Sequence, residues 1–286
     1  MGRQKRKEYA FYAVLAGTFL LITGAYGSGE KSVQQNAKEM GAVAEKAVAE
    51  PEYVPAVRLY AGIFTKLDGE EYAVIEKNKD ILVAAAQGPK SWGEGRAWSG
   101  EWSNQYVRGN YFGNFGCGLC CMANIYSTFS GHTCSPWDMF LYAREVSGYT
   151  PTKKIGAIGW GDMKTVMRKC GFDAELYTKP QDYETFRDQV RSAKSVVVLV
   201  SSHEDNTYWK KTGGHYVNIS LYKEDTDEVF LADPADPDGN RNYIPLRYVY
   251  DALKTVSKYQ YLLVNGYSEE QNQWKQDGID EAWVAP

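Results

Sequence analysis

Hydrophobic positions after residue 116 repeat first with the period of a helix. Met122, Ile125, Tyr126 and Phe129 are spaced i, i+3, i+4 and i+7, so they predict one apolar helical face. A second helix is predicted to open after Ser135, because a serine followed by proline and, three residues on, by an acid is typical of a helix N-terminus. The same criteria predict helices over 136–147, 162–170, 183–193 and 246–256.

The period then changes to that of a β-strand. The run 195–201 is apolar, which is typical of a buried strand, and the run 215–222 alternates. In the alternating strand, Val217, Ile219 and Leu221 are expected on one face. Further strands are predicted over 228–232 and 259–264. Helices followed by an antiparallel sheet predict the α+β class.

The first 27 residues have the pattern of a membrane-targeting segment. Four cations, at positions 3, 5, 6 and 7, precede an uncharged apolar stretch over 9–26. At 1.5 Å per residue this stretch spans about 27 Å, close to the thickness of a bilayer core. It is expected to be a transmembrane signal anchor, or a secretory signal cleaved near residues 25–27, with a buried helix as the third alternative. The cations hold the N-terminus in the cytoplasm, so either of the first two alternatives places the rest of the chain outside it.

The rest of the chain divides by composition into four segments. Residues 28–52 are polar and are expected to form a spacer without a core of its own. Residues 53–100 are expected to form an N-terminal extension that packs on the main domain. The main domain is expected over 101–267, and 268–286 is expected to be a C-terminal tail.

Composition excludes several classes of protein. Hydrophobic residues make up 44% of the 286 residues and charged residues 24%, which excludes a disordered or collagen-like chain. With 32 Lys and Arg against 36 Asp and Glu, the net charge of −4 gives no reason to expect nucleic acid as a partner. Five cysteines are too few for a disulfide scaffold, and their odd number leaves at least one unpaired.

Cys117 is the candidate nucleophile, because it stands between two glycines where a flexible loop enters a helix. The N–H groups and the dipole of a helix N-terminus stabilise anions, so they favour a thiolate and can bind an oxyanion. Gly116 and Gly118 are expected to let a substrate backbone approach the sulfur closely. Cys120 and Cys121 are expected to be small core residues.

A histidine and an aspartate occur where they could serve this thiol. His215 is the first residue of the alternating strand and is expected to share the inward face with Val217. Asp233 ends the next strand, because Pro234 cannot continue the ladder. If the two strands form a hairpin across residues 223–227, Asp233 returns close to His215 and could orient the imidazole through its Nδ1–H.

A cysteine at a helix start, followed by a histidine and an aspartate on successive strands, is the order of papain-like cysteine peptidases. The runs GCGLCCMANIYSTFSG and, later, GGHYVNISLY and DEVFLADP resemble bacteriocin double-glycine leader peptidases. The chain looks most like the free-standing peptidase family thirty-nine-like domains, over residues 105–267. The resemblance implies a papain-like fold with Cys117 as nucleophile, His215 as general base and Asp233 as the residue that orients it. It also implies an upstream glutamine that donates to the oxyanion. Gln105 is the candidate, at a longer spacing than is usual in papain-like enzymes.

Other interpretations of these residues stay open. Cys117 and Cys120 form a C-x-x-C motif at a helix start, which is also typical of thiol–disulfide oxidoreductases. A peptidase-like domain that only binds peptides is compatible with the 22 tyrosines and 8 tryptophans. Metal sites are weaker alternatives: zinc could be held by Cys117, Cys120, His132 and Cys134, and calcium by the turn 236–239.

The sequence as a whole predicts a cysteine peptidase outside the cytoplasm. It would be anchored in the cell membrane by its N-terminal helix, or secreted if that helix is cleaved. Besides the membrane, its expected partner is a peptide or protein substrate. The expected reaction is acyl transfer to the thiol of Cys117, followed by hydrolysis of the thioester, and it requires no metal and no organic cofactor.

Overall fold

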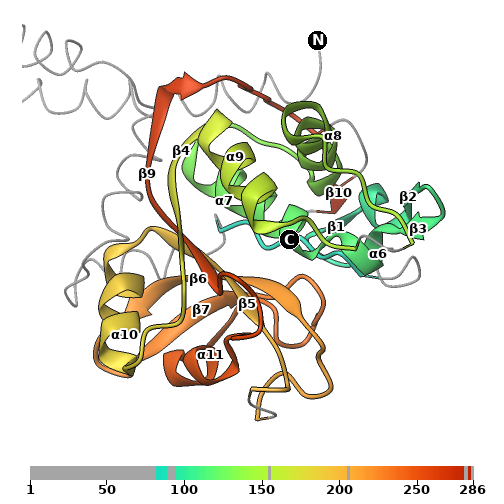
Figure 1. The fold of residues 1–286 in the computed structure, drawn as a ribbon. Coiled ribbons are helices and arrows are strands. Elements are labelled where there is room, and N and C mark those ends of the chain that lie inside the picture. Colours follow the sequence, from blue (N-terminus) through green and yellow to red (C-terminus); the bar gives the residue numbers. More distant parts are fainter. Residues whose placement is uncertain (1–81, 89–94, 154–155, 205–206, 280–282, 285–286) are drawn as a thin grey trace, which may run out of the picture. The chain divides into compact units, whose positions relative to one another are not determined.

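The structure, a computed structural model, describes residues 82–88, 95–153, 156–204, 207–279 and 283–284. In this part of the chain a group of helices comes first and a six-stranded antiparallel sheet follows (Figure 1). This order confirms the mixed helix-and-antiparallel-sheet architecture that the change of period predicts.

Four helical elements form the first half: the single turn α6 (Phe112–Phe115), α7 (Cys117–Phe129), α8 (Pro136–Ser147) and α9 (Trp160–Lys169). Helix α8 begins where predicted, because the hydroxyl of Ser135 accepts from the N–H of Asp138 and the Asp138 carboxylate accepts from the N–H of Ser135. Gly148 ends α8 with a left-handed backbone (φ 75°), which favours glycine. Helix α9 begins at Trp160 rather than at residue 162.

The sheet has the strand order β4–β9–β5–β6–β7–β8, and each neighbouring pair is antiparallel. Its strands are β4 (Cys170–Tyr177), β5 (Ser195–Val200), β6 (His215–Lys223), β7 (Glu228–Ala232), β8 (Asn242–Pro245) and β9 (Tyr261–Asn272). Four of these strands are those that the sequence predicts. Strands β4 and β8 are additional, since β4 follows α9 directly and β8 has only four residues and ends in proline.

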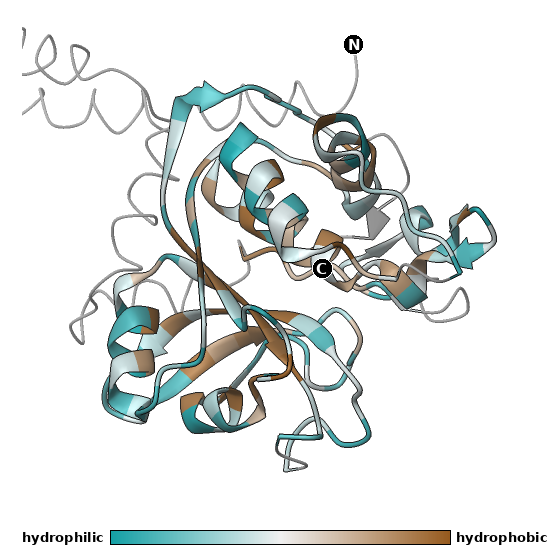
Figure 2. Cartoon of the chain, viewed as in Figure 1, coloured by the Kyte–Doolittle hydropathy of each residue, from teal (hydrophilic) through white to brown (hydrophobic). Residues whose placement is uncertain are grey.

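Each face of the sheet has its own hydrophobic core. Val197 and Leu199 of β5 belong to the core that includes α7, α8 and α9, whereas Val196 and Val198 belong to the other core. That second core includes α10 (Tyr183–Ser192) and α11 (Leu246–Ala252), and α11 is shorter than predicted. Both faces of β5 are therefore buried, which explains its uninterrupted apolar run. Figure 2 shows the apolar residues gathered along the central strands and on the helices that cover them.

Strand β6, which begins with His215, departs from strict alternation near its end. Its pairing with β7 shifts register before Lys223, and Leu221 has a left-handed backbone (φ 51°). Such a β-bulge changes the side on which the following residues lie. Leu221 therefore joins the core of α7, α8 and α9, and Tyr222 packs against the opposite core. The prediction that Leu221 shares a face with Val217 is wrong for this reason.

The segments that flank the expected main domain are hydrogen-bonded to it. Residues 82–88 run extended and are held by side chains of α7 and of the residues that follow β7. Strand β9 continues to Asn272, past the boundary expected at 267. Shorter elements complete the fold: β1 (Ser99–Gly100), which pairs with β10 (Trp283–Val284), the 3-10 turn η2 (Glu101–Asn104), and the hairpin of β2 (Tyr106–Val107) and β3 (Asn110–Tyr111). Described parts of the extension and of the expected tail thus belong to the folded structure.

Across the described ranges, no helix combines the length and the apolar character that crossing a bilayer requires. The stretch 9–26 and the spacer 28–52 lie outside the described residues. The predicted anchor or signal segment therefore stays a prediction.

Candidate functional site

Cys117 is the first residue of α7. The turn α6 leads directly into it through Gly116, whose N–H donates to the carbonyl of Phe112 at 2.7 Å. The cysteine is 6% exposed, so its sulfur lies at the N-terminal end of a helix and just below the surface. The structure thus places Cys117 at a helix start, and its role as nucleophile stays a prediction.

The glycines beside Cys117 serve packing. A Cβ atom at Gly116 would overlap the ring of Phe112, and one at Gly118 would lie 2.7 Å from Ile158. Such contacts are shorter than van der Waals distance, so a larger residue would displace α6 or α9 relative to the nucleophile. Neighbouring side chains fill the space beside both glycines, and the expectation that the glycines open the sulfur to a substrate backbone stays a prediction.

His215 and Asp233 meet as the hairpin of β6 and β7 predicts. The register pairs Asn218 with Ala232, so the residue after β7 comes level with Val217, two positions along β6 from His215. The Nε2 atom of His215 lies 2.7 Å from Oδ1 of Asp233, and both side chains are buried. The sequence predicts that Nδ1 faces the aspartate. In the structure Nε2 faces the aspartate instead, and Cys117 is the other neighbour that raises the pKa of His215.

Asp233 is held in place by several donors. Its Oδ2 accepts from the indole Nε1–H of Trp209 at 2.9 Å, and its Oδ1 accepts from the N–H groups of Ala235 and Asp236 at 2.9 and 3.2 Å. Burial alone would raise the pKa of Asp233, but the charge of His215 and these hydrogen bonds lower it. The carboxylate is therefore ionised and fixed in orientation.

The imidazole of His215 takes its charge state from its two neighbours. Burial lowers the pKa of His215, but the Asp233 carboxylate outweighs this, and with a hydrogen bond from the side of Cys117 it raises the pKa to about 10. His215 is consequently a cation at neutral pH. A cation beside a thiol at a helix N-terminus stabilises the thiolate, which is the attacking form in acyl transfer.

The structure places two glutamines near this group. Gln105, the sequence candidate, is partly exposed, and its side-chain amide donates to the carbonyl of Glu101 at 3.5 Å, within its own turn. Gln87 was not predicted. It is 8% exposed, its N–H donates to the carbonyl of Pro234 at 2.8 Å, and its Nε2 donates to the carbonyl of Gly113 at 2.9 Å.

Gln87 therefore lies between the residue after Asp233 and the turn that leads to Cys117. Its Oε1 atom is buried without a hydrogen-bond partner among the residues that the structure describes. The sequence signal for it was weak: a polar residue that ends the apolar run before a Gly-rich stretch.

The remaining cysteines are buried thiols. All five cysteines are free, and burial raises the pKa of Cys120 and of Cys121 well above the ordinary thiol range. His132 lies 2.9 Å from Glu269, and the sulfur of Cys134 accepts from Ser127. In the described residues, no three His, Cys, Asp or Glu side chains come together as metal ligands. The zinc and calcium alternatives find no support there.

The chain is similar to known proteins in two comparisons. The Peptidase_C39-like family model matches residues 102–275, which is more than half of the chain. A crystal structure described as a C39-like peptidase from Bacillus anthracis is similar over 54% of this chain and 90% of that chain, with 16% sequence identity and a TM-score of 0.36. Among curated proteins, none matches the sequence.

Proposed function

The chain belongs to the Peptidase_C39-like family, and from this premise we propose that it is a cysteine peptidase that uses Cys117, His215 and Asp233. One observation carries the proposal. A buried histidine lies 2.7 Å from a buried aspartate, and its other side faces a cysteine at a helix N-terminus. A group with this charge distribution is suited to nucleophilic catalysis by a thiolate.

The reaction would proceed in two acyl transfers. The Cys117 thiolate attacks the peptide carbonyl carbon, and the protonated His215 gives its proton to the leaving amine, which departs as the C–N bond breaks. The resulting thioester is then hydrolysed by a water whose proton passes to His215, which releases the carboxylic acid and restores the pair. N–H groups at the start of α7 would bind the oxyanion that forms in each step. Asp233 would hold the ring and stabilise the imidazolium.

A glutamine side chain would complete this oxyanion site, and the contacts favour Gln87 over Gln105. Gln87 is buried against the turn before Cys117, whereas the amide of Gln105 binds within its own turn. The family match includes Gln105 and begins after Gln87, so the two residues form a matched pair for a test. Gln87→Ala should lower turnover by about 10²-fold, as loss of an oxyanion donor does, with Gln105→Ala close to wild type. If Gln105→Ala lost more turnover than Gln87→Ala, Gln105 would be the oxyanion donor.

The place of action belongs to the proposal as well. The apolar stretch 9–26 would hold the chain in the cell membrane, and its flanking cations would place the peptidase domain outside the cytoplasm. Protease added to intact cells should then degrade the domain, and carbonate washing should leave it with the membranes. Protection of the domain in intact cells would contradict this topology. A mature N-terminus near residue 28 would replace the anchor by a cleaved signal.

The experiment for the activity combines covalent labelling with hydrolysis. The full-length chain, purified in mild detergent, is treated with a peptide-epoxide probe, the modified residue is mapped by mass spectrometry, and cleavage of a peptide library is measured in parallel. We expect the label on Cys117, and Cys117→Ala should lose both label and cleavage. Cys120→Ala is the matched control, since it removes a buried thiol on the same helix.

Two outcomes would overturn the proposal. A label that follows Cys120 would favour thiol–disulfide exchange. A labelled Cys117 without cleavage of any peptide in the library would favour a module that binds peptides and does not cut them.

A further inference from the structure

The face of α7 that is turned to the sheet carries polar side chains outside the catalytic group. The Nδ2 of Asn124 donates to Oδ1 of Asn218 at 3.2 Å, and the Oδ1 of Asn124 accepts from the N–H of Ala85 at 2.9 Å. Both asparagines are buried. Asn124 lies on the helix that begins with Cys117, and Asn218 lies on the strand that begins with His215. A buried hydrogen bond thus joins the elements that carry the nucleophile and the base.

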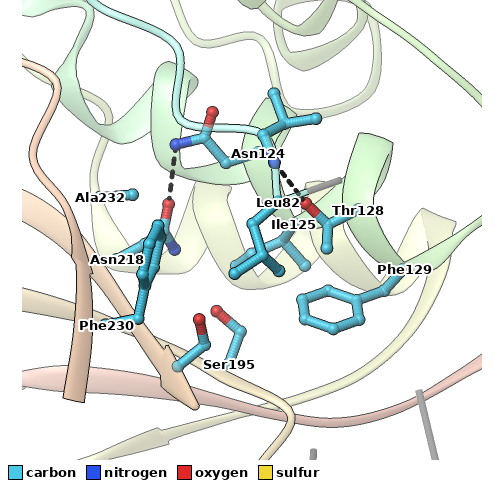
Figure 3. A pocket seen from close by; sticks show the side chains of 11 residues that line it. Leu82, Asn124, Ile125, Thr128, Phe129, Ser195, Asn218, Phe230 and Ala232 are labelled. Carbon is cyan, nitrogen blue, oxygen red and sulfur yellow. Dashed lines mark hydrogen bonds between the residues drawn. The ribbon is translucent and has the colours of Figure 1, made fainter. Parts of the chain in front are cut away.

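A cavity lies beside this hydrogen bond (Figure 3). Asn218, Ser195 and Phe230 line it from the sheet, and Leu82 and Ile125 line it from the opposite side. The cavity has a volume of about 20 Å³, which is enough for one water molecule. The mixed lining suits a molecule that makes hydrogen bonds on one side and none on the other.

The polar group that needs a partner in this cavity belongs to Asn218. Its Nδ2 is buried and has no hydrogen-bond partner among the residues that the structure describes. The hydroxyl groups of Ser195 and Ser220 line the same cavity. A buried amide donor without a partner is costly, and a bound water with two or three polar neighbours removes that cost.

We propose that the cavity binds a water molecule that accepts from Asn218 Nδ2 and donates to a lining serine hydroxyl. The bridge of Asn124, Asn218 and this water then sets the rotation of α7 against β6. Apolar packing has no preferred direction, whereas a hydrogen bond has one. Asn124 and Asn218 are therefore positioning residues: they contact neither substrate nor sulfur, and they align Cys117 with His215. The inference rests on the proposed function, since it concerns the same thiol and imidazole.

The test measures alignment without a substrate. The rate at which iodoacetamide alkylates Cys117 is measured at pH 6 and at pH 9, and the ratio of the two rates reports how far the imidazolium sustains the thiolate in acid. Asn124→Leu and Asn218→Leu should each lower this ratio about tenfold. The double variant should be no worse than either single variant, because the residues act as one bridge. Asn124→Ser, a smaller change, takes the place of the leucine variant if that chain does not fold.

Thr128→Val is the matched control. Thr128 lies on the same helix face and also lines the cavity. Its hydroxyl accepts from the N–H of Val83 at 3.1 Å, so among the described residues it connects α7 to the segment 82–88 and forms no part of the Asn124–Asn218 hydrogen bond. This variant should lower the melting temperature and keep the wild-type ratio. If the asparagine variants lower the melting temperature and also keep the wild-type ratio, the bridge is only structural and the positioning role is overturned.

A crystal structure of the full chain shows whether the cavity holds a water molecule. We expect ordered density within hydrogen-bonding distance of Asn218 Nδ2, and a dry cavity would overturn the water site. The failure of this inference and of the peptidase proposal can be told apart. A chain that cleaves no peptide, yet loses alkylation at pH 6 in the asparagine variants, refutes the peptidase and keeps the positioning role.

Discussion

The described part of the chain contains two histidine–carboxylate pairs that differ in their surroundings. Nε2 of His215 lies 2.7 Å from Asp233, and Nε2 of His132 lies 2.9 Å from Glu269. The side chains of the first pair are 10% and 1% exposed, and those of the second are 21% and 30% exposed. The two distances are nearly equal, so the bond itself does not distinguish a reactive pair from a structural one.

The neighbours make the distinction. Glu269 also pairs with Lys275 at 3.2 Å and accepts from the hydroxyl of Tyr267, so this pair ties β9 to the loop before α8. The carboxylate of Asp233 is instead fixed by Trp209 and backbone N–H groups, and its histidine turns its other side to a thiol. Burial together with an adjacent thiol makes the first pair the candidate for catalysis. The second pair is charged and partly exposed, and it connects two surface segments.

Removing the histidine of each pair should give the largest difference between them. His215→Ala should lower turnover by about 10²–10⁴-fold, because the residue that moves protons is lost. His132→Ala should leave turnover within about twofold and reduce the free energy of unfolding by about 1 kcal/mol or less, since partly exposed ion pairs contribute little. Peptide hydrolysis and urea denaturation measure both effects. Similar turnover of the two variants would remove the distinction between the pairs.

His215 and Glu269 should contribute stability that is lost at opposite ends of the pH scale. The pKa of His215 is raised to about 10, so its contribution is fully present below the unfolded value near 6.5 and is lost as the pH rises through about 10. The pKa of Glu269 is lowered to about 2, although burial opposes this, because Tyr267, His132 and Lys275 donate to the carboxylate. Its contribution is present above the unfolded value near 4.3 and is lost as the pH falls through about 2.

Urea midpoints from pH 2 to pH 10 measure this difference. His215→Ala should flatten the loss of stability on the alkaline side, and Glu269→Gln should flatten it on the acid side. If His215→Ala flattened the acid side and Glu269→Gln the alkaline side, the two residues would not contribute to stability as described here.

Within the His215–Asp233 pair, the smallest effect should come from Trp209→Phe, which keeps the packing and removes one hydrogen bond to Asp233. Loss of a hydrogen bond to a charged group corresponds to about 1.5–3 kcal/mol at most, so turnover should fall about tenfold, less than in His215→Ala. Steady-state kinetics on one peptide measure it. Tyr267→Phe is the matching change at the other pair, since it removes a hydrogen bond to Glu269. A similar fall in turnover in this variant would contradict the distinction between the two pairs.

Much of the site could be predicted because its signals are local. A cysteine between glycines at a helix start, a histidine that opens a strand and an aspartate before proline can each be found without knowing the fold. Strands β6 and β7 follow each other in the chain, so their hairpin brings His215 and Asp233 together as expected. The helix face of Met122 and the cap at Ser135 are likewise local signals.

The misses depend on contacts between distant residues. Which imidazole nitrogen faces Asp233 depends on how the ring is turned, and Trp209 together with backbone N–H groups fixes the aspartate that it meets. Gln87 comes close to Gly113 and Pro234 only in the folded chain, so its position along the sequence does not predict that it lies near Cys117. The bulge at Leu221 breaks a period that the sequence shows as continuous.

The alkylation of Cys117 tests most directly whether the buried His215–Asp233 pair activates this thiol. The rate with iodoacetamide at pH 6 is measured for the full-length wild type, His215→Ala and His132→Ala, with the modified cysteine identified by mass spectrometry. The wild type and His132→Ala should react at similar rates, and His215→Ala at least about tenfold more slowly, because it lacks the cation that sustains the thiolate in acid. Equal rates at pH 6 for the wild type and His215→Ala would contradict the account.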